Sequence, residues 1–303
     1  MIKPLLKLIF SFTILFLVFK NIDVNILLFH FHDVSYGTLF FSITFFYLHL
    51  LIQFYRWYLI LFSLGENVKK FFIFRVISIS FLFGQILPSG IGTDGTKLFL
   101  LKKNGFSLKN TILSIFIDRI IQLIVLISII IVSYKFYVTE IKIVYPYFLL
   151  ALILILFFLI LSLTIFRDIL RNFFIKSSLY SVLSTSKKNL IIFLSYKKNV
   201  LIISLLYLIS HLLIVTPIYL LISDMGIDIS FLLLFIYIPL VLLLSQIPIS
   251  VGGWGLRELS MIGVLSFVGV PKEIAFATSI IFGFALLTSR LPGIFFLIID
   301  KFK

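Results

Sequence analysis

The sequence predicts an all-α polytopic membrane protein, with about eight transmembrane helices, two short re-entrant or broken helices and an inverted-topology repeat. Three observations favour this fold class: an apolar composition, long apolar runs and a Pro/Gly motif that occurs twice. Of the 303 residues, 61% are hydrophobic and 13% are charged, whereas soluble domains have roughly 45–50% apolar and about 25% charged residues. The period-2 alternation of barrel strands is not seen, so helices must satisfy the backbone hydrogen bonds in lipid. We expect a single integral membrane domain over residues 1–303.

Eight apolar runs have the length of membrane spans. They lie at about 4–20, 36–60, 71–89, 110–134, 147–166, 199–222, 231–249 and 273–299. Two shorter apolar pieces, 96–107 and 256–269, follow the third and the seventh runs. Each reaches only about 18–20 Å, short of a ~30 Å hydrocarbon core, so we expect half-helices or re-entrant segments that cross or fold back. The first run lacks a small-residue cleavage site, and we expect it to be a retained helix.

The distribution of Lys and Arg predicts the orientation, because cytoplasmic loops are rich in these residues. The net charge is +14, which also favours contact with anionic lipid headgroups. The basic connection 167–198 is placed in the cytoplasm, as an amphipathic helix on the inner leaflet or as a plain loop. The turn 223–230 carries Asp224 and Asp228 and is placed outside. Lysines near both chain ends then place both termini in the cytoplasm, with the protein in the inner (cytoplasmic) cell membrane.

A Pro/Gly motif occurs twice, once in 85–97 and once in 245–257. At a constant offset four positions agree without a gap, and the aligned pairs are Pro88 with Pro248, Gly92 with Gly252, Gly95 with Gly255, and Lys97 with Arg257. Each copy ends an apolar run and precedes a short apolar piece, a glycine turn and a long run. The sequence therefore predicts an internal repeat over segments 71–134 and 231–299.

The two copies enter the membrane from opposite sides, because run 71–89 starts inside and run 231–249 starts outside. This result holds whether the short pieces cross or fold back. Inverted repeats with broken helices are typical of transporters, which bind their substrate at the repeat interface. Irregular backbone at membrane depth is tolerated only against protein or water, so the breaks predict a central polar cavity. The alternative interpretation is that both breaks are loops at the membrane surface.

Ionisable side chains inside membrane spans are costly and usually functional. Asp118 and Arg119 lie near the middle of run 110–134 and, as neighbours on a helix, need separate partners. Candidate partners are Asp94, Lys97, Arg257, Glu258 and Arg290. Together the seven residues carry four positive and three negative charges, and a surplus cation suits an anionic group such as a lipid phosphate. The alternative is that they form structural ion pairs between helices.

Other motifs predict no catalytic chemistry. With no cysteine, four histidines and scattered carboxylates, the sequence shows no metal or cofactor site and no Ser/His/Asp arrangement. Arg56, beside Trp57 and Tyr58, is expected to be an anchor at the membrane interface rather than a ligand. His211, in an apolar span, is expected to be a structural histidine rather than a proton relay.

The two motifs resemble those of a known family, the transmembrane, flippase-like domain of lysylphosphatidylglycerol synthases and its stand-alone relatives. The first family motif, roughly Leu-Pro-x-Gly-x-Gly-Gly-Asp-x-x-Arg, corresponds here to 87–97. The second, roughly Pro-x-x-x-Gly-Gly-x-Gly-x-Arg-Glu, corresponds to 248–258, and an Asp-Arg pair corresponds to Asp118-Arg119. Gly269-Val270 and Pro292-Gly293 also fit, so the resemblance covers essentially the whole chain. Thr93 replaces a glycine and Lys97 an arginine, and lysine lacks bidentate phosphate geometry.

The resemblance implies a lipid flippase or transporter that moves an anionic or lipid-linked substrate between leaflets. The substrate classes are a phospholipid, an aminoacyl-lipid or a polyprenyl-phosphate glycolipid. The expected substrate-binding or translocation residues are Pro88, Gly92, Asp94, Lys97, Asp118, Arg119, Gly252, Gly253, Gly255, Arg257, Glu258 and Arg290. Arg257 and Lys97 are expected to hold phosphate, with Asp94, Asp118 and Glu258 balancing charge or taking a proton.

Two rival functions remain open. The chain ends soon after its last apolar run, so we expect no aminoacyl-transferase domain, no enzymatic activity and no bound nucleic acid. One rival is a membrane module that anchors or regulates a separate glycosyl- or aminoacyl-transferase. The other is an intramembrane lipid transferase that shares the phosphatidylglycerol lysyltransferase name of the family. The sequence does not indicate an oligomeric state.

Overall fold

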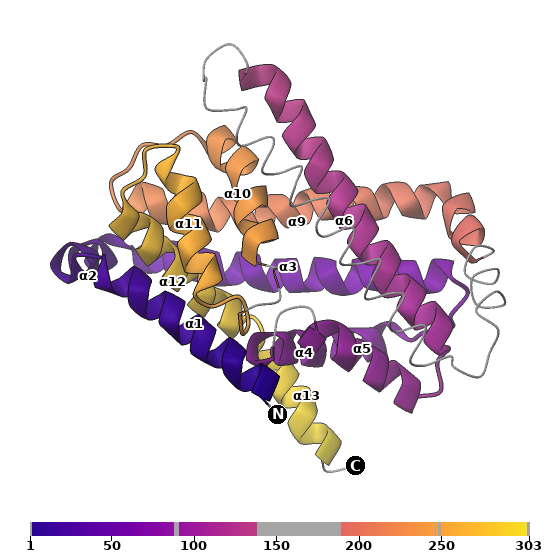
Figure 1. Ribbon diagram of the computed structural model, residues 1–303. Helices are drawn as coiled ribbons and strands as arrows, with labels where there is room; N and C mark the ends of the chain where they lie inside the picture. Colours follow the sequence, from indigo (N-terminus) through magenta and orange to yellow (C-terminus); the bar gives the residue numbers. More distant parts are fainter. Residues whose placement is uncertain (1, 88–90, 138–188, 246, 248–249, 302–303) are drawn as a thin grey trace. The chain divides into compact units, whose positions relative to one another are not determined.

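The computed structural model describes residues 2–87, 91–137, 189–245, 247 and 250–301, and within these ranges it consists of helices joined by turns, with no β-strand (Figure 1). The helices are α1 (Ile2–Lys20), α2 (Val24–Asp33), α3 (Tyr36–Ser63), α4 (Lys70–Ile86), α5 (Ile91–Lys103), α6 (Leu108–Tyr137), α9 (Lys197–Asp224), α10 (Phe231–Ser245), α11 (Leu256–Ser266), α12 (Lys272–Thr288) and α13 (Leu291–Lys301). This confirms the all-α class. The predicted run 147–166 and most of connection 167–198 lie outside the described residues, although 189–195 are helical.

Four helices of the described residues are long and apolar enough to cross a membrane: α3, α6, α9 and the pair α12–α13. The pair α1–α2 makes a fifth candidate if its two arms, bent by 93°, form one span. Large apolar side chains face outward, with Phe12, Phe40 and Phe71 each about two-thirds exposed. Such a surface suits lipid rather than water, and the protein is therefore a multi-pass membrane protein. The eight spans and the inverted repeat stay predictions.

The helix α2 was missed by the hydropathy pattern, which ended the first run at Lys20. Its sequence carries Asn25, two histidines and Asp33, so it does not read as a span. The chain bends just before α2, because Asp23 caps the new helix by accepting hydrogen bonds from the N–H groups of Asn25 and Ile26, at 2.9 and 3.3 Å. An Asp at this position is a common helix start signal.

The helices divide into two compact units. Unit 1 contains residues 1–51, 77–96 and 210–303, and unit 2 contains residues 52–76 and 97–209. In unit 1, α11 contacts α10, α12 and α1, and α12 contacts α2. Close packing in unit 1 depends on small residues, since Gly293 of α13 lies directly against the main chain of Ser78 in α4. In unit 2, the Asn199 side chain of α9 donates to the Ser63 hydroxyl of α3 at 2.9 Å.

The helices around the two Pro/Gly breaks have the same order of lengths: a long helix and a shorter one precede each break, and a short one follows it. The helices α3, α4 and α5 have 28, 17 and 13 residues, and α9, α10 and α11 have 28, 15 and 11. Each series has a glycine turn at corresponding places: Gly65 and Gly226 follow the long helix, and Gly105 and Gly269 follow the short one. All four have φ between 80° and 83°, which is the left-handed C-terminal cap that favours glycine.

Candidate functional site

The two Pro/Gly breaks meet inside unit 1. The main-chain N–H of Gly252, in the second break, donates a hydrogen bond to the Leu87 carbonyl, in the first break, at 3.4 Å. Gly252 has φ 58°, and a Cβ at this position would lie 2.5 Å from the Gln85 carbonyl oxygen. Only glycine allows this approach without displacing α4.

On the two sides of the first break, α4 and α5 pack against each other. A Cβ on Gly92 would lie 2.6 Å from the Phe83 carbonyl oxygen, so the first turn of α5 packs against the last turns of α4. Gly84 of α4 lies equally close to the Thr93 side chain. Thr93, where the family motif has glycine, therefore packs against a glycine on the opposite side of the break. Pro88, a predicted site residue, lies outside the described residues.

The second break is held against α1. The N–H of Val251 donates to the Ser11 hydroxyl at 2.9 Å, and a Cβ on Gly255 would lie 2.8 Å from the Ser11 carbonyl oxygen. Gly253 and Gly255 have φ 82° and 85°. The predicted glycines of this motif thus give the backbone its shape and its close contacts.

Arg257 and Glu258 form a buried ion pair in the first turn of α11. Nη2 and Nε of Arg257 donate to Oε1 of Glu258 at 2.6 and 3.0 Å. The other carboxylate oxygen accepts from the Gly255 N–H at 2.6 Å, and the Ser279 hydroxyl of α12 lies 3.3 Å from Oε1. The two side chains are 5% and 0% exposed. This carboxylate is therefore fully hydrogen-bonded, as a buried charge requires.

The guanidinium of Arg257 also lies against aromatic rings. Its Cζ is 4.4 Å from the ring centre of Trp254 and 5.7 Å from that of Phe282. Gly283 of α12 lies so close to the guanidinium that a Cβ would not fit. The pair and its surroundings thus join α11 to α12.

Arg290 lies at the short interruption between α12 and α13 and is 5% exposed. Its guanidinium carbon lies 4.5 Å from the ring centre of Phe81 in α4. Within the described part of the chain, its Nε and Nη1 have no hydrogen-bond partner. Arg290 therefore differs from Arg257, whose guanidinium is paired with a carboxylate.

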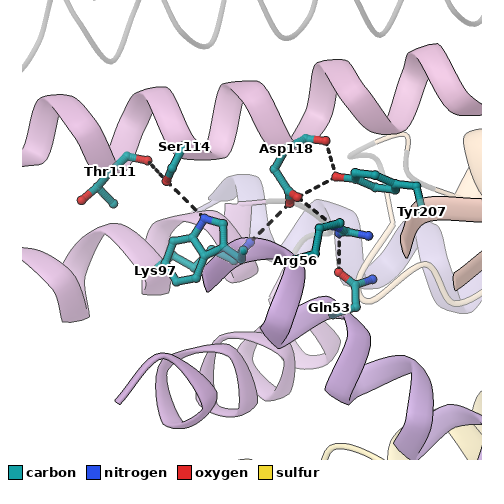
Figure 2. Close-up of polar contacts among 8 residues, drawn as sticks. Gln53, Arg56, Lys97, Thr111, Ser114, Asp118 and Tyr207 are labelled. Carbon is teal, nitrogen blue, oxygen red and sulfur yellow. Dashed lines mark hydrogen bonds and ion pairs between the residues drawn. The ribbon is translucent and has the colours of Figure 1, made fainter. Parts of the chain in front are cut away.

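Unit 2 contains a second buried charge cluster, centred on Asp118 of α6 (Figure 2). Nε of Arg56, in α3, donates to Asp118 Oδ1 at 3.0 Å, and Nζ of Lys97, in α5, lies 3.9 Å from Oδ2. The Tyr207 hydroxyl, from α9, donates to Oδ1 at 2.6 Å and also reaches the Asp118 carbonyl oxygen. One carboxylate thus ties together helices from four places in the sequence. Of the predicted partners, Lys97 is confirmed as a neighbour of Asp118.

The expectation for Arg56 and Trp57 was wrong. Both are buried, at 3% and 0% exposure, rather than anchored at a membrane interface. Nη2 of Arg56 donates to the Gln53 side chain at 2.7 Å, and its guanidinium stacks on the Tyr207 ring at 3.5 Å. Nε1 of Trp57 donates to the Ser114 hydroxyl at 3.1 Å. The Trp57 ring also lies 4.9 Å from Nζ of Lys97.

Three further predicted or considered residues have individual surroundings. Asp94 lies in the first turn of α5 and Arg119 follows Asp118 in α6; both are half-buried and interact with neighbouring groups. Nε2 of His211 lies 2.9 Å from the Phe235 carbonyl oxygen, which agrees with a structural histidine. Across the described ranges, no three His, Asp or Glu side chains are grouped so as to hold a metal ion.

The family model for the lysylphosphatidylglycerol synthase TM region matches residues 5–292, which is nearly the whole chain. The chain belongs to this family. Its membership agrees with the resemblance seen in the two motifs, and it places the protein among membrane proteins of lipid metabolism or transport. The match covers the membrane region alone, and no catalytic domain of the synthase is evident in this chain. Among curated proteins, none matches the sequence.

Proposed function

We propose that this protein translocates an anionic or lipid-linked substrate between the leaflets of the cytoplasmic membrane. The observation that carries the proposal is the contact between the two Pro/Gly breaks in unit 1, where the Gly252 N–H bonds to the Leu87 carbonyl. Broken helices that meet inside a bundle create polar backbone at membrane depth, which is how many transporters build a substrate site. Membership of a lipid-related family makes a lipid the natural substrate.

The proposal includes eight spans in an inverted-topology repeat, with both termini in the cytoplasm. The matching order of α3–α5 and α9–α11, with glycine turns at corresponding places, supports the repeat. In this arrangement α4 enters the membrane from the cytoplasm and α10 from outside. The motion of one copy against the other would expose the substrate site to each leaflet in turn.

In this proposal each motif contributes one cation that can bind a lipid phosphate, Arg257 in unit 1 and Lys97 in unit 2. Both are paired with carboxylates in the structure, Arg257 with Glu258 and Lys97 with Asp118. A phosphate must therefore compete with the carboxylate, which balances the charge or takes a proton when the substrate binds. The Lys97 contact is long, at 3.9 Å, so this lysine is the easier of the two to recruit.

The test is a leaflet-exchange assay on purified protein in liposomes. Fluorescent phospholipids and polyprenyl-phosphate lipids are placed in both leaflets, and the outer-leaflet probe is quenched over time. We expect faster exchange than in protein-free liposomes for an anionic lipid, and loss of that exchange in Arg257→Ala protein that still elutes as a folded monodisperse species. Folded protein that moves none of these lipids would contradict the proposal.

The two rival functions predict different results with the same purified protein. An intramembrane transferase would change the lipid chemically, which thin-layer chromatography and mass spectrometry of the recovered lipid would show. A regulatory module would be inactive alone and would purify with a glycosyl- or aminoacyl-transferase. A partner that restores lipid movement would assign the protein to the module class.

A further inference from the structure

The side chain of Arg290 is buried in unit 1 with part of its hydrogen-bonding capacity unused. It is 5% exposed, and Nε and Nη1 have no hydrogen-bond partner among the described residues. Arg290 lies about 14 Å along the helix from the end of the candidate span Lys272–Ile299, so it is far from both ends of this span. A guanidinium remains charged in proteins, and two unused buried donors are costly unless a ligand satisfies them.

The surroundings of Arg290 come from α4, the helix that leads into the first break. The guanidinium lies 4.5 Å from the ring centre of Phe81, and Gly293 holds the start of α13 against Ser78 of the same helix, α4. Gln85 follows Phe81 by one helical turn, so both side chains share one face of α4. Gln85 Oε1 is likewise buried and has no hydrogen-bond partner in the described part of the chain.

The main chain of Gln85 is also the point that Gly252 approaches, since a Cβ on Gly252 would lie 2.5 Å from the Gln85 carbonyl oxygen. Among the described residues, α4 thus has unpartnered donors of Arg290 beside Phe81 and an unpartnered acceptor on Gln85, one helical turn closer to the meeting of the two breaks. A phosphodiester matches the donors, because its anionic oxygens accept charge-assisted hydrogen bonds from an arginine. A hydroxyl on the headgroup would match the acceptor.

We propose that Arg290 and Gln85 form a binding site for a phosphate oxyanion, with Arg290 holding the phosphate and Gln85 accepting a hydrogen bond from a headgroup hydroxyl. The inference rests on the proposed function and deepens it, because it adds to phosphate recognition a guanidinium that has no carboxylate partner among the described residues. Arg257, by contrast, already has Glu258. Phe81 positions the guanidinium by stacking beneath it.

Binding is measured on the full chain in a neutral detergent, with radiolabelled short-chain phosphatidylglycerol at increasing concentrations. We expect saturable binding that weakens at least about tenfold in Arg290→Met and partly recovers in Arg290→Lys. The matched control is Arg75→Gln, which removes one positive charge from α4 outside unit 1 and should leave the affinity unchanged. Unchanged affinity in Arg290→Met would overturn the site and indicate that its donors bind only water.

Two further arms identify the ligand. Phosphatidylmethanol has the same phosphodiester charge but no headgroup hydroxyl, so wild-type protein should prefer phosphatidylglycerol and Gln85→Leu protein should bind both equally. A preference that survives in Gln85→Leu would remove Gln85 from the site. Competition by inorganic phosphate as strong as that by the lipid would assign the oxyanion site to free phosphate.

Thermal unfolding keeps the proposal testable if a variant binds nothing. Arg290→Met removes a buried charge that has no ion-pair partner among the described residues, so without lipid it should unfold at a higher temperature than wild type. Added phosphatidylglycerol should raise the unfolding temperature of wild type but not of the variant. A variant less stable than wild type would show that Arg290 is a structural residue and would contradict the site. Phosphatidylglycerol binding without leaflet exchange would retain the site and refute the flippase. Leaflet exchange that persists in Arg290→Met would retain the flippase and refute the site.

Discussion

The N–H of Gly252 donates a hydrogen bond to the carbonyl of Leu87, at 3.4 Å, and thereby joins two breaks that lie far apart in the sequence. Both residues belong to unit 1, in which α11 also packs against α10 and α12. The contact requires a glycine at a positive φ and at a close approach to α4. It is therefore the structural basis for the proposed substrate site.

The Asp118 cluster should contribute strongly to stability. Asp118→Asn leaves Arg56 and Lys97 buried without their carboxylate, and breaking a buried pair in this way costs about 3–5 kcal/mol. Tyr207→Phe removes only a hydroxyl donor, and the expected cost is about 1 kcal/mol. Unfolding of the purified variants in detergent measures both, and equal effects of the two substitutions would show that the cluster is not centred on the carboxylate.

The Arg257–Glu258 pair should show coupling in a double-mutant cycle. Each single change, Arg257→Leu or Glu258→Leu, leaves one buried charge alone, so each should destabilise by about 3–5 kcal/mol. The double variant removes both charges and should be less destabilised than the sum of the singles. Additive effects on the unfolding free energy would indicate that the two side chains act independently.

The inverted topology can be tested with single cysteines, because the sequence contains none. Glu66→Cys lies in the turn after α3, and Asp228→Cys lies in the turn after α9. We expect a membrane-impermeant thiol reagent to label Asp228→Cys in intact cells and Glu66→Cys only after the membrane is opened. Labelling of both from the same side would refute the inverted repeat, and the permeabilised sample controls for buried cysteines.

The helical class and the two breaks were predictable because hydropathy and Pro/Gly positions are local signals. The same signals could not identify the partners of Asp118, since Arg56 and Tyr207 lie far from it in the sequence. From the sequence alone, Arg56 beside Trp57 and Tyr58 looks like an anchor at the membrane interface. Only the packing of the helices shows that Arg56 and Trp57 are buried.

The pairing of Arg257 with Glu258 also went beyond the sequence argument, which held that neighbours on a helix do not face each other. The two residues lie in the first turn of α11, where Glu258 turns back to the Gly255 N–H and thereby reaches Arg257. The spacing Gly-x-x-Glu at a helix start was the available signal, because a Glu at this position often caps the helix. The run 147–166 lies outside the described residues, so this span stays a prediction.

The central claim is that the substrate passes where the two breaks meet, and the most direct measurement is leaflet exchange with Gly252→Ala in liposomes. The control is Gly263→Ala, in α11, because a Cβ on Gly263 meets no atom within 4 Å. At Gly252 the added methyl group would force the breaks apart, so we predict exchange close to the protein-free rate for Gly252→Ala and wild-type exchange for Gly263→Ala, both as folded protein. Wild-type exchange in Gly252→Ala would contradict the account.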